Sequence, residues 1–155
     1  MVKHMVELPT MCVVMIPCTG GSSWQHVNSS NEQCRKRLKE HRRLFSKLWT
    51  SFEKLMPHVA KSESSVVPEW SDTCMCWKFR HVAPLCHKYG FKFCNADGCM
   101  CGMSSYVGDG LLRKRWRVAY LNCDPAAVFA NHGRTCDGTH EHVTCEGLDT
   151  DVSGY

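Results

Sequence analysis

Hydrophobic residues recur along this chain with two different spacings, which predict alternating strands and helices. An uninterrupted apolar run at residues 12–16 ends at Pro17. Strands that are covered on both faces lose the polar alternation, so this run predicts a buried strand that the proline terminates. Cys18 follows directly, and ligands of open α/β sheets bind just beyond the carboxyl ends of strands. Cys18 is therefore a candidate functional residue, with a core or vestigial cysteine as the alternative.

The next pattern has a helical period. Apolar residues recur at three- and four-residue steps between Leu38 and Met56, and the opposite face of this stretch is basic. Ser30 and Gln33 have the spacing of a capping box, and Pro57 should stop the helix. These features predict a surface helix from about residue 30 to residue 56 whose apolar stripe packs against a sheet.

Shorter segments complete the predicted order of elements. A strand at residues 66–67 should be closed by Pro68-Glu69-Trp70, and residues 79–89 predict a short helix. Residues 91–94 and 113–121 alternate with a period of two, which predicts two strands that pair as a hairpin with a long loop. This order predicts an α/β domain with an antiparallel edge hairpin.

Length and cysteine content limit the possible classes of protein. The 155 residues suffice for one domain with a hydrophobic core, and no apolar run approaches the roughly 20 residues that span a bilayer. The first 18 residues lack a secretory signal pattern, so we expect a soluble, intracellular protein, cytoplasmic or nuclear, with no membrane partner. In such a reducing compartment the 12 cysteines should be thiols or metal ligands.

The net charge of +4 is concentrated in two stretches, residues 35–47 and 113–117. Basic stretches of this kind are often only a solvated face, but they are also where phosphates can be bound. Four cations on one helix face are therefore candidate nucleic-acid-binding residues: Arg35, Arg42, Arg43 and Lys47.

The C-terminal segment contains a second group with possible chemistry. Two histidines two residues apart project on the same side of an extended segment, and flanking cysteines can complete a tetrahedral zinc site. The predicted ligands are Cys136, His140, His142 and Cys145, with Cys123 in reserve. The alternative is that both histidines are exposed loop residues.

Two further cysteine pairs have a spacing that is less typical of zinc sites. Cys74 and Cys76 are separated by one residue, as are Cys99 and Cys101. Structural zinc sites usually place two to four residues between paired cysteines, so we expect these four to be ordinary reduced thiols.

Several of these features occur in the same order as the motifs of DNA cytosine-5 methyltransferases. Pro17-Cys18 follows an apolar strand and precedes a long helix, Glu69 follows the next strand, and Arg113-x-Arg115-x-Arg117 lies on a later strand. The chain therefore resembles the C-terminal half of that family. It is most similar to methyltransferase-like segments in polyproteins of retrotransposable elements.

The resemblance implies roles for several residues. Cys18 would attack C6 of a flipped-out cytosine, Glu69 would contact the ring nitrogen, and Arg115 and Arg117 would support both. It also implies a partial class I methyltransferase-like, Rossmann-like sheet in residues 1–122, followed by a Cys/His-containing tail in 123–155.

The resemblance does not include the half of the methyltransferase domain that binds the cofactor. No Gly-x-Gly-x-x-Gly or Walker-type loop follows a predicted strand, so S-adenosylmethionine would bind only if another part of a polyprotein supplied that half. Two functions remain open. One is a methyltransferase-like, nucleic-acid-directed domain of mobile-element origin that is incomplete or inactive alone, and the other is a non-enzymatic nucleic-acid-binding module with a zinc-stabilised tail.

Overall fold

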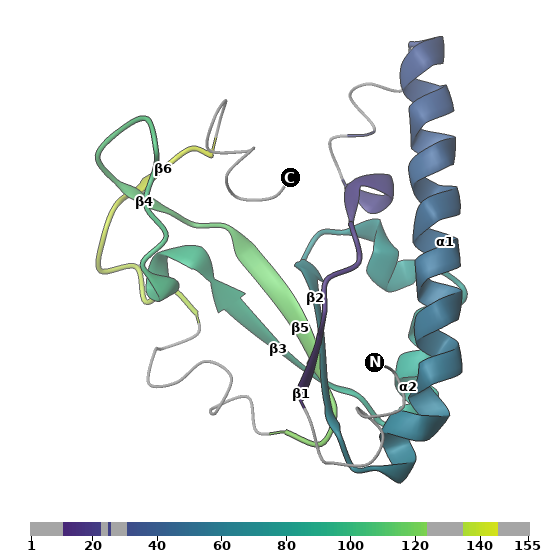
Figure 1. Ribbon diagram of the computed structural model, residues 1–155. Coiled ribbons are helices and arrows are strands. Elements are labelled where there is room, and N and C mark those ends of the chain that lie inside the picture. The colour runs from purple at the N-terminus through teal and green to yellow at the C-terminus, as the bar shows by residue number, and fades with distance from the viewer. Residues whose placement is uncertain (1–10, 23–24, 26–30, 124–134, 146–155) are drawn as a thin grey trace.

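The computed structural model describes residues 11–22, 25, 31–123 and 135–145, and its fold is mixed α/β (Figure 1). None of the helices in these ranges is long and apolar enough to cross a membrane. In chain order the elements are β1 (Met11–Val14), η2 (Thr19–Gly21), α1 (Glu32–Lys61), β2 (Ser65–Ser71), η4 (Met75–Lys78), α2 (Ala83–Tyr89), β3 (Lys92–Asp97), η5 (Gly98–Cys101), β4 (Leu111–Leu112), β5 (Arg115–Tyr120) and β6 (His142–Val143).

The main sheet has four strands in the order β1-β2-β5-β3. β1 and β2 are parallel and are joined by the crossover helix α1, whereas β5 is antiparallel to both β2 and β3. The predicted hairpin is confirmed, since β3 and β5 pair from Lys92 opposite Tyr120 to Asp97 opposite Arg115. β4 and β6 form a separate parallel pair.

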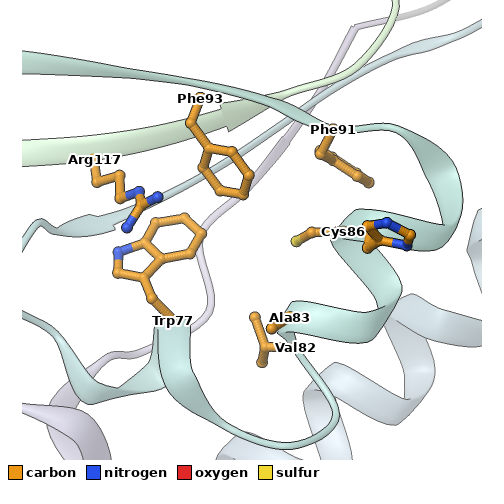
Figure 2. Close-up of a pocket in the computed structure, with 8 residues that line it drawn as sticks. Trp77, Val82, Ala83, Cys86, Phe91, Phe93 and Arg117 are labelled. Atoms are coloured by element: carbon orange, nitrogen blue, oxygen red, sulfur yellow. The ribbon is translucent and has the colours of Figure 1, made fainter.

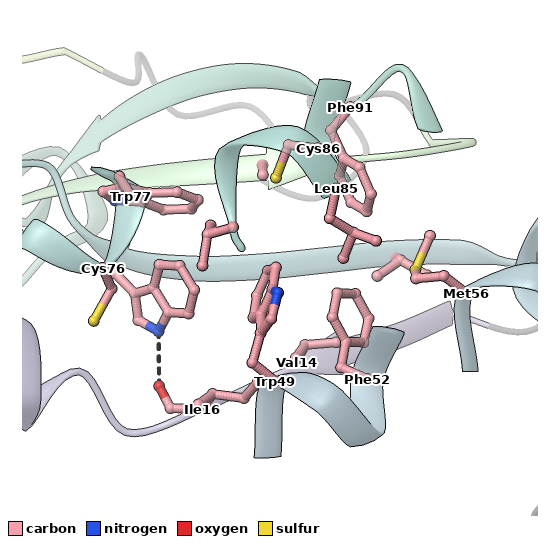
Figure 3. Packing of buried hydrophobic residues seen from close by; sticks show 14 of the residues in the cluster. Val14, Ile16, Trp49, Phe52, Met56, Cys76, Trp77, Leu85, Cys86 and Phe91 are labelled. Atoms are coloured by element: carbon pink, nitrogen blue, oxygen red, sulfur yellow. Dashed lines mark hydrogen bonds between the residues drawn. The ribbon is translucent and has the colours of Figure 1, made fainter. Parts of the chain in front are cut away.

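The hydrophobic core lies between the sheet and the two helices, which Figure 1 shows on the same side of it. The predicted apolar stripe of α1 supplies four buried residues to this core, Phe45, Trp49, Phe52 and Met56, and Val59 in the last turn adds a fifth. The indole N–H of Trp70 in β2 donates to the carbonyl oxygen of Ile16 at 2.7 Å (Figure 3). This bond satisfies a buried donor and holds the chain just before Cys18 against the core.

The predicted burial of residues 12–16 on both faces is wrong. Val14 and Ile16 are buried in the core, but Val13 is 52% exposed and Met15 is 80% exposed. β1 is an edge strand and only its core-facing residues contact the helices, so its side chains alternate between buried and exposed.

The prediction that Pro57 ends the long helix is also wrong. Pro57 lies inside α1, which continues to Lys61. The proline is exposed, while Met56 and Val59 on either side of it are buried. Packing of these two side chains outweighs the cost of the missing N–H, and tertiary contacts of this kind commonly override local preference.

Pro68 likewise fails to close the second strand, because β2 extends from Ser65 to Ser71. Val66 pairs with Leu121 before the proline, and Glu69 pairs with Val118 after it. Both pairs belong to the same antiparallel register. Only the donor at Pro68 itself is missing from this ladder, so the strand continues.

The helix ends follow local capping chemistry. Asn31 caps α1, its side-chain oxygen accepting from the N–H of Gln33 at 2.8 Å, whereas the predicted cap, Ser30, lies outside the described residues. The helix predicted at residues 79–89 is the shorter α2, which ends at Gly90 with φ of 70°. That left-handed conformation favours glycine.

Candidate metal centre and adjoining sheet edge

The strand directions bring several functional groups to one edge of the sheet. β1 and β2 are parallel, and β2 and β3 are both antiparallel to β5. The carboxyl ends of β1, β2 and β3 therefore lie at the same edge as the start of β5. Ligand sites of open sheets form at such an edge.

A group of four potential metal ligands lies beside this edge. The sulfur atoms of Cys99 and Cys136 and ring nitrogens of His140 and His142 all lie within 4.8 Å of one another. Cys136 Sγ is 3.3 Å from His142 Nε2 and 3.7 Å from His140 Nε2. Tetrahedral zinc with usual bond lengths places sulfur and nitrogen ligands about 3.6 Å apart. This Cys/His group can therefore hold a metal ion.

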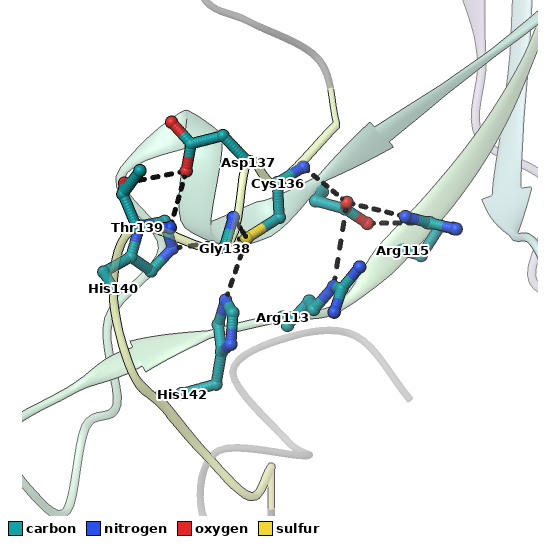
Figure 4. Close-up of polar contacts among 9 residues, drawn as sticks. Arg113, Arg115, Cys136, Asp137, Gly138, Thr139, His140 and His142 are labelled. Atoms are coloured by element: carbon teal, nitrogen blue, oxygen red, sulfur yellow. Dashed lines mark hydrogen bonds and ion pairs between the residues drawn. The ribbon is translucent and has the colours of Figure 1, made fainter.

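The ligand loop has the supporting contacts that metal sites use (Figure 4). The backbone N–H of Gly138 donates to Cys136 Sγ at 3.3 Å, and Gly138 has φ of 76°. The backbone N–H of Cys136 donates to the buried carboxylate of Asp97 at 2.7 Å. Such bonds orient ligands before a metal binds.

Asp97 is in turn held by the sheet. Arg115 donates to both of its carboxylate oxygens, at 2.7 and 2.8 Å, and Arg113 Nε lies 3.8 Å from Oδ2. The hydrogen bonds from Arg115, with help from the Cys136 N–H, lower the pKa of Asp97 to about 2 against the opposing effect of burial. The carboxylate thus stays charged and ties β3, β5 and the ligand loop together.

Two glycines allow the close packing that positions the ligands. A Cβ on Gly98 would lie 3.0 Å from Met103 Sδ and 3.1 Å from the carbonyl oxygen of Leu112, so a larger residue at the start of η5 would displace these neighbours one residue before Cys99. A Cβ on Gly110 would lie 2.5 Å from a methyl carbon of Val143, and Gly110 has φ of 151°. Gly110 thus lets β6 lie against β4, which fixes the position of His142.

Three of the four sequence-predicted ligands come together in this group, and the fourth ligand is Cys99 in place of Cys145. Among the residues that the structure describes, Cys145 and Cys123 both lie outside the group. Cys99 was expected to be an ordinary thiol because Cys-x-Cys spacing is atypical of zinc. The pairing of β3 with β5, the β4–β6 pair and the bond from Cys136 to Asp97 together bring this distant residue to the histidines.

Cys18 and Glu69, two of the predicted catalytic residues, lie close to the buried Lys114. Lys114 is only 6% exposed, and both groups counteract the lowering of its pKa by burial. Burial raises the pKa of Glu69, and the charge of Lys114 opposes that shift. The three groups are therefore coupled electrostatically at the ends of β1 and β2 and the start of β5.

The thiol of Cys18 is not activated in this arrangement. Its hydrogen bond with Cys74 and its burial raise the pKa of Cys18, and the opposing effect of Lys114 is smaller. The thiolate is the nucleophilic form of cysteine, so a raised pKa leaves Cys18 mostly unreactive at neutral pH.

The two predicted catalytic arginines do not join Cys18 and Glu69. Glu69 pairs with Val118, so the alternation of β5 places Arg115 and Arg117 on the opposite face of the sheet. Arg115 binds Asp97. The guanidinium of Arg117 lies over the ring of Phe93 at 4.7 Å.

The predicted nucleic-acid-binding cations, Arg35, Arg42, Arg43 and Lys47, are all exposed on α1. Arg42 also has a structural contact, because its Nε donates to the carbonyl oxygen of Gly20 at 3.0 Å. Arg42 further lines a hollow of about 280 Å³ together with Arg80 and His81. No carboxylate is among the described residues that line this hollow.

The described residues thus form a Cys/His group that can hold a metal ion and, at the same sheet edge, a thiol, a carboxyl and an amine. Basic side chains lie on α1. These features rest on the chain's own geometry, since no protein-family model, no curated protein and no solved structure matches this chain.

Proposed function

We propose that this chain is a zinc-stabilised nucleic-acid-binding module without catalytic activity of its own. The observation that carries the proposal is the group of Cys99, Cys136, His140 and His142. Two thiolates and two imidazoles select zinc over hard cations such as magnesium or calcium. Four protein ligands leave no open coordination position, as in structural and not catalytic zinc sites.

In this proposal zinc orders the ligand loop. Residues 135–145 contribute no fully buried side chain, and β6 consists of only two residues. A segment with so little apolar burial gains its order from other interactions. In small zinc sites the free energy of metal binding, on the order of 10 kcal/mol, is itself folding free energy.

The nucleic-acid part of the proposal rests on the charge of α1. Its buried residues begin at Phe45, so the preceding turns extend beyond the hydrophobic core and expose Arg35, Arg42 and Arg43. The hollow formed with Arg80 and His81 continues this positive surface. Contacts from such cations to phosphates supply most of the affinity of sequence-independent binding.

The test is the salt dependence of binding to a fluorescent oligonucleotide, measured by anisotropy. Replacement of Arg35, Arg43 and Lys47 by Gln should flatten the slope of log affinity against log salt by about two to three, because each neutralised phosphate releases counterions. The matched control replaces three exposed lysines that lie off α1, Lys78, Lys88 and Lys92, by Gln. Equal slopes in both triple variants would overturn the proposed interface.

The second candidate function is the cytosine-5 methyltransferase-like one, on a partial class I sheet. It is favoured by the proximity of Cys18 and Glu69 to Lys114 at the carboxyl ends of parallel strands. In that case the remainder of a polyprotein supplies the cofactor-binding half. Isothermal titration of this chain with S-adenosylmethionine tests it, and no heat of binding would exclude methyl transfer by this chain alone.

A further inference from the structure

A pocket of about 300 Å³ lies between α2, η4 and the β3–β5 hairpin, and none of its lining residues belongs to the Cys/His group. Figure 2 shows Arg117, Phe93 and Trp77 along one side and Phe91 and Cys86 along the other. Phe91 and Trp77 are buried, but Phe93 is 41% exposed. Three large aromatic side chains thus line the pocket, and one of them lies at the open side.

Arg117 provides the charge of this pocket. Its guanidinium lies 4.7 Å from the ring centre of Phe93 and 5.8 Å from that of Trp77. Such stacking fixes a guanidinium plane while leaving its N–H groups available. Within the described ranges no carboxylate forms an ion pair with Arg117.

The remaining lining residues are Val82, Ala83, Cys86 and His87, and no carboxylate is among them. Burial raises the pKa of the Cys86 thiol to about 11 against the effect of Arg117, so this thiol is neutral at physiological pH. The pocket therefore combines flat apolar walls with one fixed set of cationic donors. This chemistry fits a planar ring that carries hydrogen-bond acceptors, and it disfavours a cation.

We propose that this pocket holds an unpaired base of a single-stranded nucleic acid, stacked on the aromatic walls with its acceptor atoms bonded to Arg117. The proposal rests on the proposed nucleic-acid-binding function and names the form of nucleic acid that the chain prefers. A base inside a duplex is stacked on both faces and paired along one edge, so it cannot enter the pocket. Stacking of splayed bases on aromatic and arginine side chains is how single strands are commonly bound.

The test compares two fluorescent probes of equal length, a single-stranded oligothymidine and a duplex, by anisotropy at one salt concentration. Phe93→Leu and Arg117→Gln should each weaken single-strand binding by about 5- to 100-fold, the range observed for loss of one base-stacking contact, and change duplex binding much less. Lys92→Gln is the matched charge control, because Lys92 is an exposed neighbour on β3. Phe93→Tyr keeps the ring and should retain single-strand affinity.

The outcomes separate this proposal from the function on which it rests. Unchanged single-strand affinity in Phe93→Leu and Arg117→Gln would overturn the base pocket, while salt-dependent binding through α1 would still stand. Loss of affinity for both probes by the same factor would also overturn it, since that pattern indicates a general charge or folding effect.

A third probe covers the case in which no oligonucleotide binds. Thymidine alone is then titrated while the side-chain NMR signals of Trp77 and Phe93 are followed. Shifts that vanish in Phe93→Leu would support the pocket although the proposed nucleic-acid function had failed. No shift at millimolar thymidine would overturn the base pocket as well as the nucleic-acid-binding function.

Discussion

At the scale of single residues, Cys18 and Asp97 show how neighbours set the charge of a group at the same sheet edge. Arg115 keeps Asp97 ionised by two short hydrogen bonds, whereas Cys74 and burial keep Cys18 protonated. Asp97 is thereby suited to hold the backbone of Cys136, and Cys18 is poorly suited to attack a substrate.

The state of Cys18 leads to a prediction about its reactivity. With limiting iodoacetamide at pH 7.5, the exposed Cys101 should be alkylated well before Cys18, because only the thiolate reacts and the pKa of Cys18 is raised. Mass spectrometry of tryptic peptides measures the order. As the thiol ionises only far above neutral pH, its rate should still rise with pH where the rate of an ordinary thiol has levelled off. Alkylation of Cys18 ahead of Cys101 at pH 7.5 would contradict this and favour the methyltransferase-like function.

At the scale of elements, the short pair of β4 and β6 determines where His142 lies. Leu111 pairs with His142 and Leu112 pairs with Val143, so the ligand His142 is part of a strand. Two residues per strand give little stability by themselves. Their association depends on the close approach of Val143 to the backbone at Gly110.

Gly110→Ala should therefore weaken zinc binding, although residue 110 is not a ligand. The added Cβ would lie 2.5 Å from Val143 Cγ1, and the positive φ of 151° is strained for alanine. We expect a loss of about 10-fold or more in zinc affinity, comparable with loss of other contacts that orient ligands, in a competition titration with a chromogenic chelator.

Gly108→Ala is the control for this substitution. Its Cβ would have only Ser105 Oγ near it, at 4.0 Å, and so it should leave zinc affinity unchanged. Equal affinities of the two variants would show that the β4–β6 pair does not position His142.

At the scale of the whole molecule, the Cys/His group joins the end of the hairpin strand β3 to the C-terminal segment. Cys99 lies in η5, the short helix that directly follows β3. The other three ligands, Cys136, His140 and His142, come from residues 135–145. Metal binding closes a long loop of the chain and stabilises the folded state by mass action. Removal of zinc should lower the melting temperature.

The identity of the cysteine ligands gives the sharpest test at this scale. Purified protein should contain about one equivalent of zinc, which Cys99→Ser should remove and Cys145→Ser should not, because Cys99 lies in the group and Cys145 does not. Metal content by mass spectrometry and the melting temperature with and without chelator measure both effects. Zinc retained in Cys99→Ser but lost in Cys145→Ser would instead support the ligand set expected from sequence spacing.

The sequence by itself determined the features that depend on neighbours a few residues apart. The helical period of α1, the alternation of β5 and the closely spaced Cys136, His140 and His142 are all local patterns, and the structure contains the helix, the strand and the grouped ligands. Even local signals had limits. Pro57 and Pro68 were expected to end their elements, but packing and ladder bonds on both sides of each proline extend them.

Only the tertiary structure decided which distant groups meet. The register of β2, β5 and β3 places Glu69 and Arg117 on opposite faces and brings Asp97 opposite Arg115. A shift of one residue would reverse these faces, and no local pattern specifies the pairing of strands that are far apart in the chain. For the same reason Cys99, and not Cys145, completes the metal group: its position depends on where β3 ends in the sheet, while spacing along the chain carries no information about that contact.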